Sequence, residues 1–294
     1  MNNDNLKNLI KKQKSNYTLD QEFYVDDYIF NLDIKNIFSK QWVFVGHTSR
    51  IPKHGDFFLF NIGKESIIII RDKDNKIYAH YNVCRHRGSH ICLEESGNKK
   101  LLVCPYHAWS YNLDGSIKSA RLMNDNFNKE EWSLNKCNLK IFEGLIFINL
   151  SDKPNDFNEF ISPTKEFIKL HGLSNAKIAH RQMYPTNGNW KLTLDNFHEC
   201  YHCQPAHPEY CKVHDKEYII AYGAGSNTGP SSKKFDKILQ NWNEKVKKMG
   251  HVTGEYSESE FNDYSRSAER TPLKEGMFTE TKSGKPVSKL MGDF

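Results

Sequence analysis

Two short motifs, each combining a cysteine with a histidine, constrain this chain more than any other feature. CRH occupies residues 84–86 and CPYH occupies residues 104–107. Two thiolates and two imidazoles could hold one metal centre, and zinc accepts such a ligand set. Structural zinc sites, however, usually group like ligands as C-x₂₋₄-C and H-x₃₋₅-H pairs. Here each motif mixes the two ligand types, which favours a centre with two chemically different ends.

An iron–sulfur cluster of the Rieske type has such a division, because thiolates bind one iron and imidazoles bind the other. The text CRHRG at 84–88, followed by CPYHAWSY at 104–111, closely resembles Rieske domains. We expect Trp109 and Tyr106 to shield the centre. The alternative interpretation is that these four residues bind zinc or no metal at all. The cluster ligands that the resemblance implies are Cys84, His86, Cys104 and His107.

The composition is that of a globular chain with a core. Of 294 residues, 38% are hydrophobic and 26% charged, which allows one large or two ordinary domains. No apolar run approaches the ~18 residues of a membrane span. The first 16 residues lack the apolar region of a secretory signal. We therefore expect a cytoplasmic protein without a membrane segment.

The net charge of +5 does not predict nucleic-acid binding. The basic run at 245–248 has acidic residues on both sides, which is typical of a solvated helix face. The 7 cysteines do not predict disulfides, since a cytosolic chain of this size rarely forms them.

The pattern along the chain predicts an N-terminal segment over 1–41, loose at 1–16, followed by helical spacing over 24–42. From 42 to 150 we expect an all-β domain that carries both metal-ligand motifs at strand ends. Turn signals at 61–63, 72–75 and 114–115 separate its apolar segments. The expected strands are 57–60, 66–70, 77–81 and 145–149.

A polar break at 151–156 predicts a domain joint, with a second domain over 151–294. Its first part predicts a helix over 156–171 and a strand over 176–184. A helix over 189–202 follows, and another is expected over 233–249.

A second ligand constellation lies in NWKLTLDNFHECYHCQPAHP, residues 189–208. Glu199 and His202 are three apart and share a helix face. His207 follows beyond the break that Pro205 imposes. Two histidines and one carboxylate can form the facial triad of non-haem Fe(II) oxygenases. Histidines at helix ends also arise as caps or packed residues, so this motif gains force from the one upstream.

With both motifs in order, residues 20–294 resemble the large (α) subunit of Rieske non-haem iron, ring-hydroxylating oxygenases. The match is NWK…EN…E-x-YH…H, with Asp195-Asn196 standing where that text has Glu-Asn. The resemblance implies an α+β protein, in which an antiparallel sheet with helices forms the catalytic domain. It also implies that His202 and His207 hold a mononuclear Fe(II). Glu199 then becomes a bridging acid between His107 of one subunit and His202 of the next, in a homotrimer.

The family's third iron ligand is an aspartate well downstream of the histidine pair. Asp293 is a candidate, but it lies next to the last residue, Phe294. The alternative that we favour is that the chain is C-terminally truncated and lacks this ligand, which puts its iron affinity and its activity by itself in doubt.

The implied reaction is O₂ activation with electrons from a separate NAD(P)H-dependent reductase that carries flavin and a [2Fe-2S] cluster. The text DNFHECYHCQPAHPE most resembles the branch acting on quaternary ammonium compounds, where hydroxylation of an N-methyl group ends in N-demethylation. Arene hydroxylation is the rival within the family. An electron-transfer protein with a degenerate iron site, or a zinc-stabilised binding protein, are alternatives from other classes.

Overall fold

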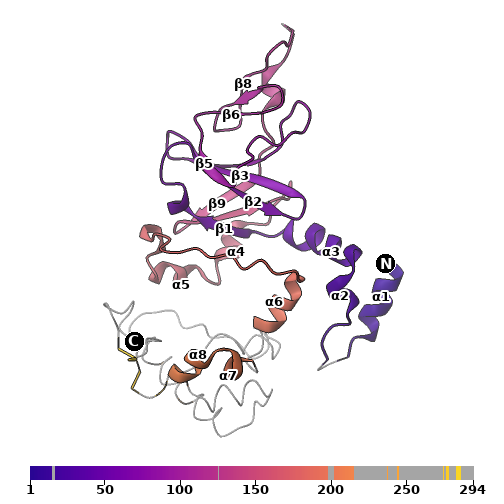
Figure 1. Cartoon of the computed structure of the whole chain (residues 1–294), viewed down its shortest axis with the longest axis vertical. Coiled ribbons are helices and arrows are strands. Elements are labelled where there is room, and N and C mark those ends of the chain that lie inside the picture. The colour runs from indigo at the N-terminus through magenta and orange to yellow at the C-terminus, as the bar shows by residue number, and fades with distance from the viewer. Residues whose placement is uncertain are drawn as a thin grey trace. The chain divides into compact units, whose positions relative to one another are not determined.

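The computed structural model describes residues 1–14, 17–124, 126–197 and 202–214, with isolated positions between 237 and 285 (Figure 1). The chain forms two compact units, Met1–Tyr184 and Pro185–Phe294. In these described residues, no helix is both long and apolar enough to cross a membrane. The helix predicted over 233–249 lies outside the described residues except for Lys237 and Glu244, which are helical.

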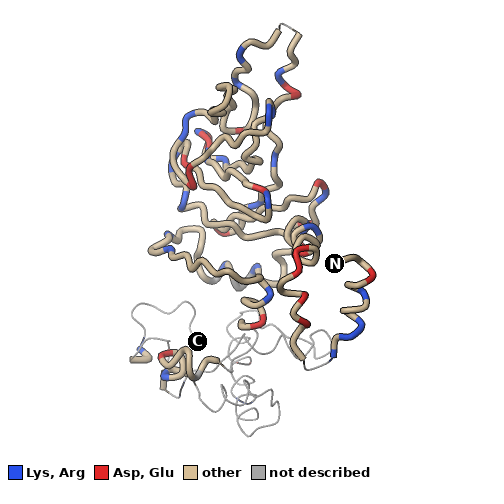
Figure 2. Tube along the Cα trace, turned by 45° about the vertical axis from the view of Figure 1, so that its right-hand side comes forward, with Lys and Arg blue, Asp and Glu red and all other residues tan. Residues whose placement is uncertain are grey.

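The first unit begins with helices. The expected helix over 24–42 is confirmed in pieces, because Asp26 adopts an extended conformation and caps the next helix through Tyr28 N and Ile29 N. Acidic residues recur along this stretch, whereas acidic and basic residues interleave over much of the tube (Figure 2). The elements are α1 (Asn3–Lys12), α2 (Glu22–Val25), α3 (Asp27–Asp33) and the π-helical turn η1 (Ile34–Phe38).

Three antiparallel sheets follow, and the strands predicted at 57–60, 66–70, 77–81 and 145–149 are confirmed. The first sheet has the order β1 (Val43–His47), β10 (Leu145–Asn149), β9 (Asn138–Phe142). The second has the order β4 (Ile77–Tyr81), β3 (Glu65–Arg71), β2 (Asp56–Ile62), β5 (Ser96–Asn98). The third has the order β6 (Leu102–Val103), β7 (Ser110–Tyr111), β8 (Ile117–Ser119). Short 3₁₀ turns are η2 (Thr48–Arg50) and η3 (Lys129–Trp132).

Strand β3 is apolar on both faces because it lies between two cores. Ile68 and Ile70 pack into one core, and Ile67 and Ile69 pack into the other. All four are fully buried, so this strand reads as a continuous apolar run and not as an alternation. The first core also contains Cys84, Cys104, Trp109 and Tyr111, so β3 supports the ligand loops.

The expected turns are present where the backbone needs a left-handed residue. Gly63, Asn75 and Gly115 have φ of 58°, 61° and 87°. Between β9 and β10, Glu143 and Gly144 both have positive φ, which is the two-residue hairpin geometry that matches strand twist.

The segment after β10 belongs to the first compact unit. Phe157 packs edge-on against Trp42, with ring centroids 5.1 Å apart, and Trp42 Nε1 donates to Asn155 O at 2.9 Å. The helix expected over 156–171 is confirmed as α4 (Phe157–Ile161) and α5 (Lys165–Leu170), and η4 (Leu173–Asn175) follows. These contacts place the start of this segment, from Asn155 to Ile161, in the first unit. The domain joint expected at 151–156 stays a prediction.

The strand expected over 176–184 is wrong. This stretch has no strand assignment and is almost wholly exposed. Ile178, Met183 and Tyr184 are 45%, 65% and 77% exposed. Extended backbone becomes a strand only when a neighbour supplies a hydrogen-bond ladder.

The described part of the second unit is helical. The helix expected over 189–202 is confirmed as α6 (Trp190–Phe197), and residues 198–201 lie outside the described residues. Helices α7 (Cys203–Ala206) and α8 (Pro208–Val213) follow, with Pro208 in the first turn of α8. The α+β class is confirmed, with the all-β region first. The antiparallel sheet expected in the second domain falls outside the described residues.

Candidate metal centres

The two CxH-type loops have the same backbone geometry. Cys84 O accepts from Gly88 N at 2.9 Å, and Cys104 O accepts from Ala108 N at 3.0 Å. The amide of each cysteine also bonds across its loop, Cys84 N to Ser89 O and Cys104 N to Trp109 O, both at 2.8 Å. Gly88 and Ala108 occupy matching left-handed positions, with φ of 77° and 58°. The chain thus builds one loop shape twice, each time presenting a cysteine and a histidine.

Asn82 holds the first loop, and the sequence reasoning did not identify it. Its Oδ1 accepts from Ile91 N at 2.9 Å and Cys92 N at 2.8 Å. Its Nδ2 donates to Cys92 O at 2.8 Å and to Ser66 Oγ at 3.3 Å. The residue is fully buried, so these bonds replace water and fix both ends of the loop on β3.

The loops bring the four predicted ligands together as a sulfur pair and a nitrogen pair. Cys84 and Cys104 are both 2% exposed and their thiols interact. The rings of His86 and His107 lie 4.6 Å apart at 73°. The Nδ1 atom of His86 is buried and has no hydrogen-bond partner among the described residues. A buried nitrogen without a partner fits a metal ligand, since burial without a bond is costly.

This pairing fits a two-iron centre. A Rieske cluster needs only two protein ligands on each iron. The buried thiols and the more exposed imidazoles match its two ends.

Tyr111 contacts the sulfur of Cys84 directly, and the sequence reasoning also missed it. Its hydroxyl accepts from Arg85 N at 3.1 Å, which leaves its own hydrogen for Cys84 Sγ at 3.2 Å. Burial raises the pKa of Tyr111 far above its ordinary value, so the hydroxyl remains a donor. The position of Tyr111 two residues after Trp109 was the available signal.

Trp109 lies against one ring of the nitrogen pair, that of His86. It is 2% exposed and stacks on His86 with centroids 4.7 Å apart and planes at 9°. Phe127 and Trp132 pack edge-on against Trp109, with ring centroids 5.5 and 5.7 Å away. The ring centroids of Tyr106 and His107 lie 3.8 Å apart. Tyr106 is 60% exposed, so it covers the His107 ring only in part.

The ionisation of the loops matters for metal loading. Burial raises the pKa of the Cys84 thiol, against the opposing hydrogen bond from Tyr111. Desolvation and the nearby His86 and Arg87 lower the pKa of His107, which favours the neutral imidazole that binds metal. A metal must therefore displace thiol protons when it enters.

The second constellation lies at the junction of α7 and α8. The rings of His202 and His207 are 5.2 Å apart at 79°. His207 N donates to Cys203 O at 2.9 Å, and Cys211 N donates to His207 O at 3.1 Å. The two buried cysteines thus fasten the backbone on either side of His207.

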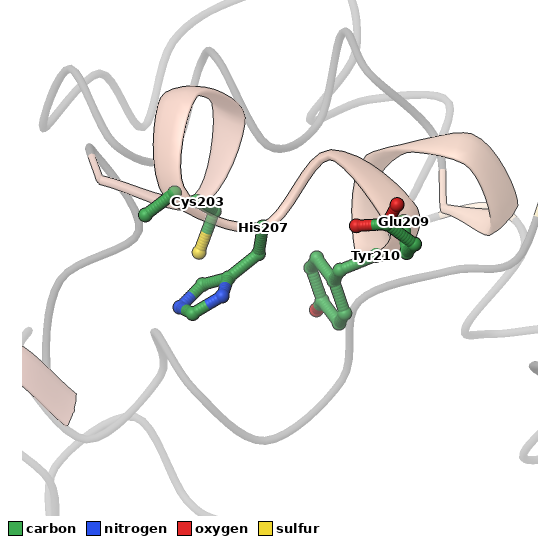
Figure 3. Close-up of a pocket in the computed structure, with 5 residues that line it drawn as sticks. Cys203, His207, Glu209 and Tyr210 are labelled. Carbon is green, nitrogen blue, oxygen red and sulfur yellow. The ribbon is translucent and has the colours of Figure 1, made fainter.

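A pocket of about 360 Å³ opens beside His207 (Figure 3). The imidazole of His207 and the sulfur of Cys203 lie side by side, with Glu209 and Tyr210 further along the same wall. Glu209 also forms an exposed ion pair with Lys212 at 3.8 Å. The lining residues are Cys203, Ala206, His207, Glu209 and Tyr210.

The structure brings together the two histidines of this site. Glu199 and Asp293 both lie outside the described residues. Two facing imidazoles fit part of a mononuclear iron site, which is completed by a carboxylate and by open positions.

Two successive regions of the chain match known protein families. The Rieske [2Fe-2S] domain matches residues 41–139, and the ring hydroxylating alpha subunit (catalytic domain) matches residues 173–285. The glycine betaine monooxygenase oxygenase subunit of Pseudomonas aeruginosa is 33% identical over 97% of this chain and 64% of that protein. The carnitine monooxygenase oxygenase subunit of Acinetobacter baumannii is 36% identical over 74% of this chain and 62% of that protein.

Among solved structures, a quaternary ammonium Rieske monooxygenase matches with a TM-score of 0.62 and 34% identity, over 66% of this chain and 54% of that one. Naphthalene 1,2-dioxygenase from Rhodococcus sp. also reaches 0.62, with 30% identity over 69% of this chain and 48% of that one. The chain spans 64% and 62% of the length of the two curated relatives named above.

Proposed function

We propose, from the premise that this chain belongs to the Rieske non-haem iron oxygenases as a ring-hydroxylating α subunit, that it serves an N-demethylating monooxygenase. Its substrate would be a quaternary ammonium compound such as glycine betaine or carnitine. The observation that carries this proposal is the co-occurrence, in one chain, of the paired Cys–His loops and the His202–His207 pair. The identity to betaine and carnitine oxygenase subunits supports the substrate class.

The family holds a [2Fe-2S] cluster and a mononuclear Fe(II), which supply one-electron transfer and O₂ activation when bound. In this chain Cys84 and Cys104 would hold one end of the cluster, and His86 and His107 the other. His202 and His207 would hold the mononuclear iron. Trp109 would exclude water from the cluster, and Tyr111 would orient Cys84.

Glu199 is proposed to bridge His107 of one subunit and His202 of the next. A carboxylate between two imidazoles can accept from both rings and fix their orientation. This role requires a homotrimer with neighbours arranged head to tail. The structure matched above is described as revealing inter-subunit electron transfer in that relative. Asp293 stays the candidate for a third iron ligand.

The pocket beside His207 supports a cationic substrate. Glu209, which also pairs with Lys212, and the ring of Tyr210, which stacks on His214 with centroids 3.9 Å apart, lie in the same wall. A quaternary ammonium group is attracted to both, because aromatic faces bind cations.

Oxygenases of this family depend on a reductase partner. We propose an NAD(P)H-dependent reductase with flavin and [2Fe-2S] groups, acting with this chain in the cytoplasm, where thiols stay reduced.

The test is formaldehyde release from glycine betaine, carnitine and choline, with NADH and a reductase of this class. The proposal predicts release from at least one of them, with one NADH consumed per formaldehyde. Matched reactions with benzene and naphthalene test the rival. Benzene 1,2-dioxygenase subunit alpha of Pseudomonas putida is 30% identical over 61% of this chain and 41% of that protein. Diol formation without formaldehyde would replace the proposed substrate class by arenes.

A further inference from the structure

His80 is a buried titratable residue that the proposed reaction does not use. It lies on β4, opposite Ile68 of β3, and its exposed fraction is 0%. Its Nε2 lies 2.9 Å from Leu113 O, so this nitrogen carries the hydrogen and donates it. Its Nδ1 is buried without a hydrogen-bond partner among the described residues. The ring is therefore held as one neutral tautomer.

The contact of His80 is with the turn that joins β7 to β8. This turn closes through Asn112 N to Ser116 O at 2.8 Å and Gly115 N to Asn112 O at 3.0 Å. Gly115 passes directly over the ring, since a Cβ there would lie 2.8 Å from His80 Nδ1. Strand β7 ends at Tyr111, and the second ligand loop immediately precedes this strand. His80 thus links the main sheet to the hairpin that follows the loop.

Burial, more than the charges around it, disfavours an added proton on His80. Asp114 lies on the turn itself, and Lys136 belongs to the segment that forms a β-bridge with His80. Tyr78, on the same strand, stacks parallel to the ring at 6.0 Å. Burial lowers the pKa of His80 and Lys136 acts in the same sense, while the bond to Leu113 and the charge of Asp114 oppose them.

We propose that neutral His80 fastens the turn at 112–116 to β4, and that protonation of its Nδ1 releases this joint in acid. A second N–H at Nδ1 would face Gly115 in a buried site that offers it no acceptor. The hairpin after the second ligand loop is then the first part of the β region to loosen as the pH falls. The joint depends on the protein fold and not on the reaction assigned above.

The sign of the effect follows from proton linkage. Because the folded joint disfavours the proton, the open form binds it more tightly, and the joint weakens as the pH falls below the ordinary histidine pKa of about 6.5. The effect is absent above this pH. Below it, opening becomes easier by up to about tenfold for each pH unit.

Amide hydrogen exchange of the full chain between about pH 7.5 and about pH 5.5 tests the joint within the range where histidine titrates. His80→Gln keeps a donor for Leu113 O but does not titrate in this range. At the acidic end, amides of 112–136 should exchange faster in the wild type than in His80→Gln at the same pH. Amides of 138–149 and the control His180→Gln, an exposed histidine, should show no such difference. Equal pH dependence in wild type and His80→Gln would overturn the proposal.

A second measurement needs no variant. Exchange of the histidine C2 hydrogens, followed by mass spectrometry, reports each ring in the native chain. The ring of His80 should exchange many-fold more slowly than that of exposed His180 near neutral pH, and this difference between the two rates should narrow as the pH falls below about 6.5. Equal rates for the two rings would overturn the proposal. Both measurements remain informative if the chain has no oxygenase activity, so the two proposals can fail separately.

Discussion

The hydroxyl of Tyr111 lies 3.2 Å from the sulfur of Cys84, although the two residues are 27 positions apart in the sequence. Because Arg85 N occupies the acceptor side of the oxygen, the hydroxyl hydrogen points to the sulfur. A donor aimed at a cluster thiolate stabilises the more negative, reduced state. This contact therefore links the packing of the first core to the redox property of the proposed cluster.

Replacing Tyr111 by phenylalanine should lower the reduction potential of the cluster. Loss of one hydrogen bond to a charged group, partly offset in the oxidised state, corresponds to about 30–60 mV for a one-electron couple. The measurement is a redox titration followed by EPR. Tyr106→Phe is the control, since its ring is 60% exposed and lies against His107 instead of Cys84. An unchanged potential in Tyr111→Phe would show that the hydroxyl does not act on the sulfur.

Asn82 should be essential for the first ligand loop. Asn82→Ala removes the amide that bonds Ile91, Cys92 and Ser66, and it leaves buried partners unpaired. We expect a loss of about 3 kcal/mol in the free energy of unfolding, measured by urea denaturation. Exposed Asn61→Ala should change it by less than about 0.5 kcal/mol. Equal stability of the two variants would contradict the role of Asn82.

Two glycines with positive φ allow the cost of backbone strain to be measured apart from the cost of a steric collision. At Gly144, with φ of +80°, a Cβ would lie 2.2 Å from His47 Nε2, whereas at Gly172, with φ of +58°, it meets nothing within 4 Å. His47 Nε2 bonds Leu173 O at 2.8 Å, so it has no room to give way. Gly172→Ala should cost about 1 kcal/mol and Gly144→Ala at least about 2 kcal/mol in thermal unfolding. A similar cost at both positions would rule out the collision.

The histidine pair of the second unit should bind iron independently of the cluster. His202→Ala and His207→Ala should each remove the mononuclear iron and formaldehyde release, while the visible spectrum of the cluster stays the same. Loss of one ligand typically abolishes a site that has few protein ligands. The control is His171→Ala, an exposed histidine of the first unit. Iron content by mass spectrometry and the visible spectrum provide the comparison. Full iron retention in His202→Ala would place the mononuclear site elsewhere.

Much of the first unit could be predicted from local patterns. The runs that became β2, β3, β4 and β10 are rich in Ile and Phe, and turn residues bound them. The twin loops were visible because their ligands are close in sequence. Asn82 and Tyr111 could not be assigned, because their roles depend on the packing of one loop against another.

The failures arise where structure depends on distant partners. The segment 176–184 is predicted as a strand, but no ladder forms on it in the described residues. Helices α4 and α5 join the first unit because Phe157 packs against Trp42, a contact between residues far apart in sequence. His80 carried no motif, and only its burial and its unpartnered nitrogen distinguish it.

The most direct test of the central claim is the metal and sulfide content of the anaerobically purified chain, together with the EPR spectrum after reduction. The account predicts two irons and two acid-labile sulfides in the cluster, with a reduced signal whose average g is that of a histidine-ligated centre. Cys84→Ser should lose all of them. Colourless protein that contains zinc and no sulfide would contradict the account.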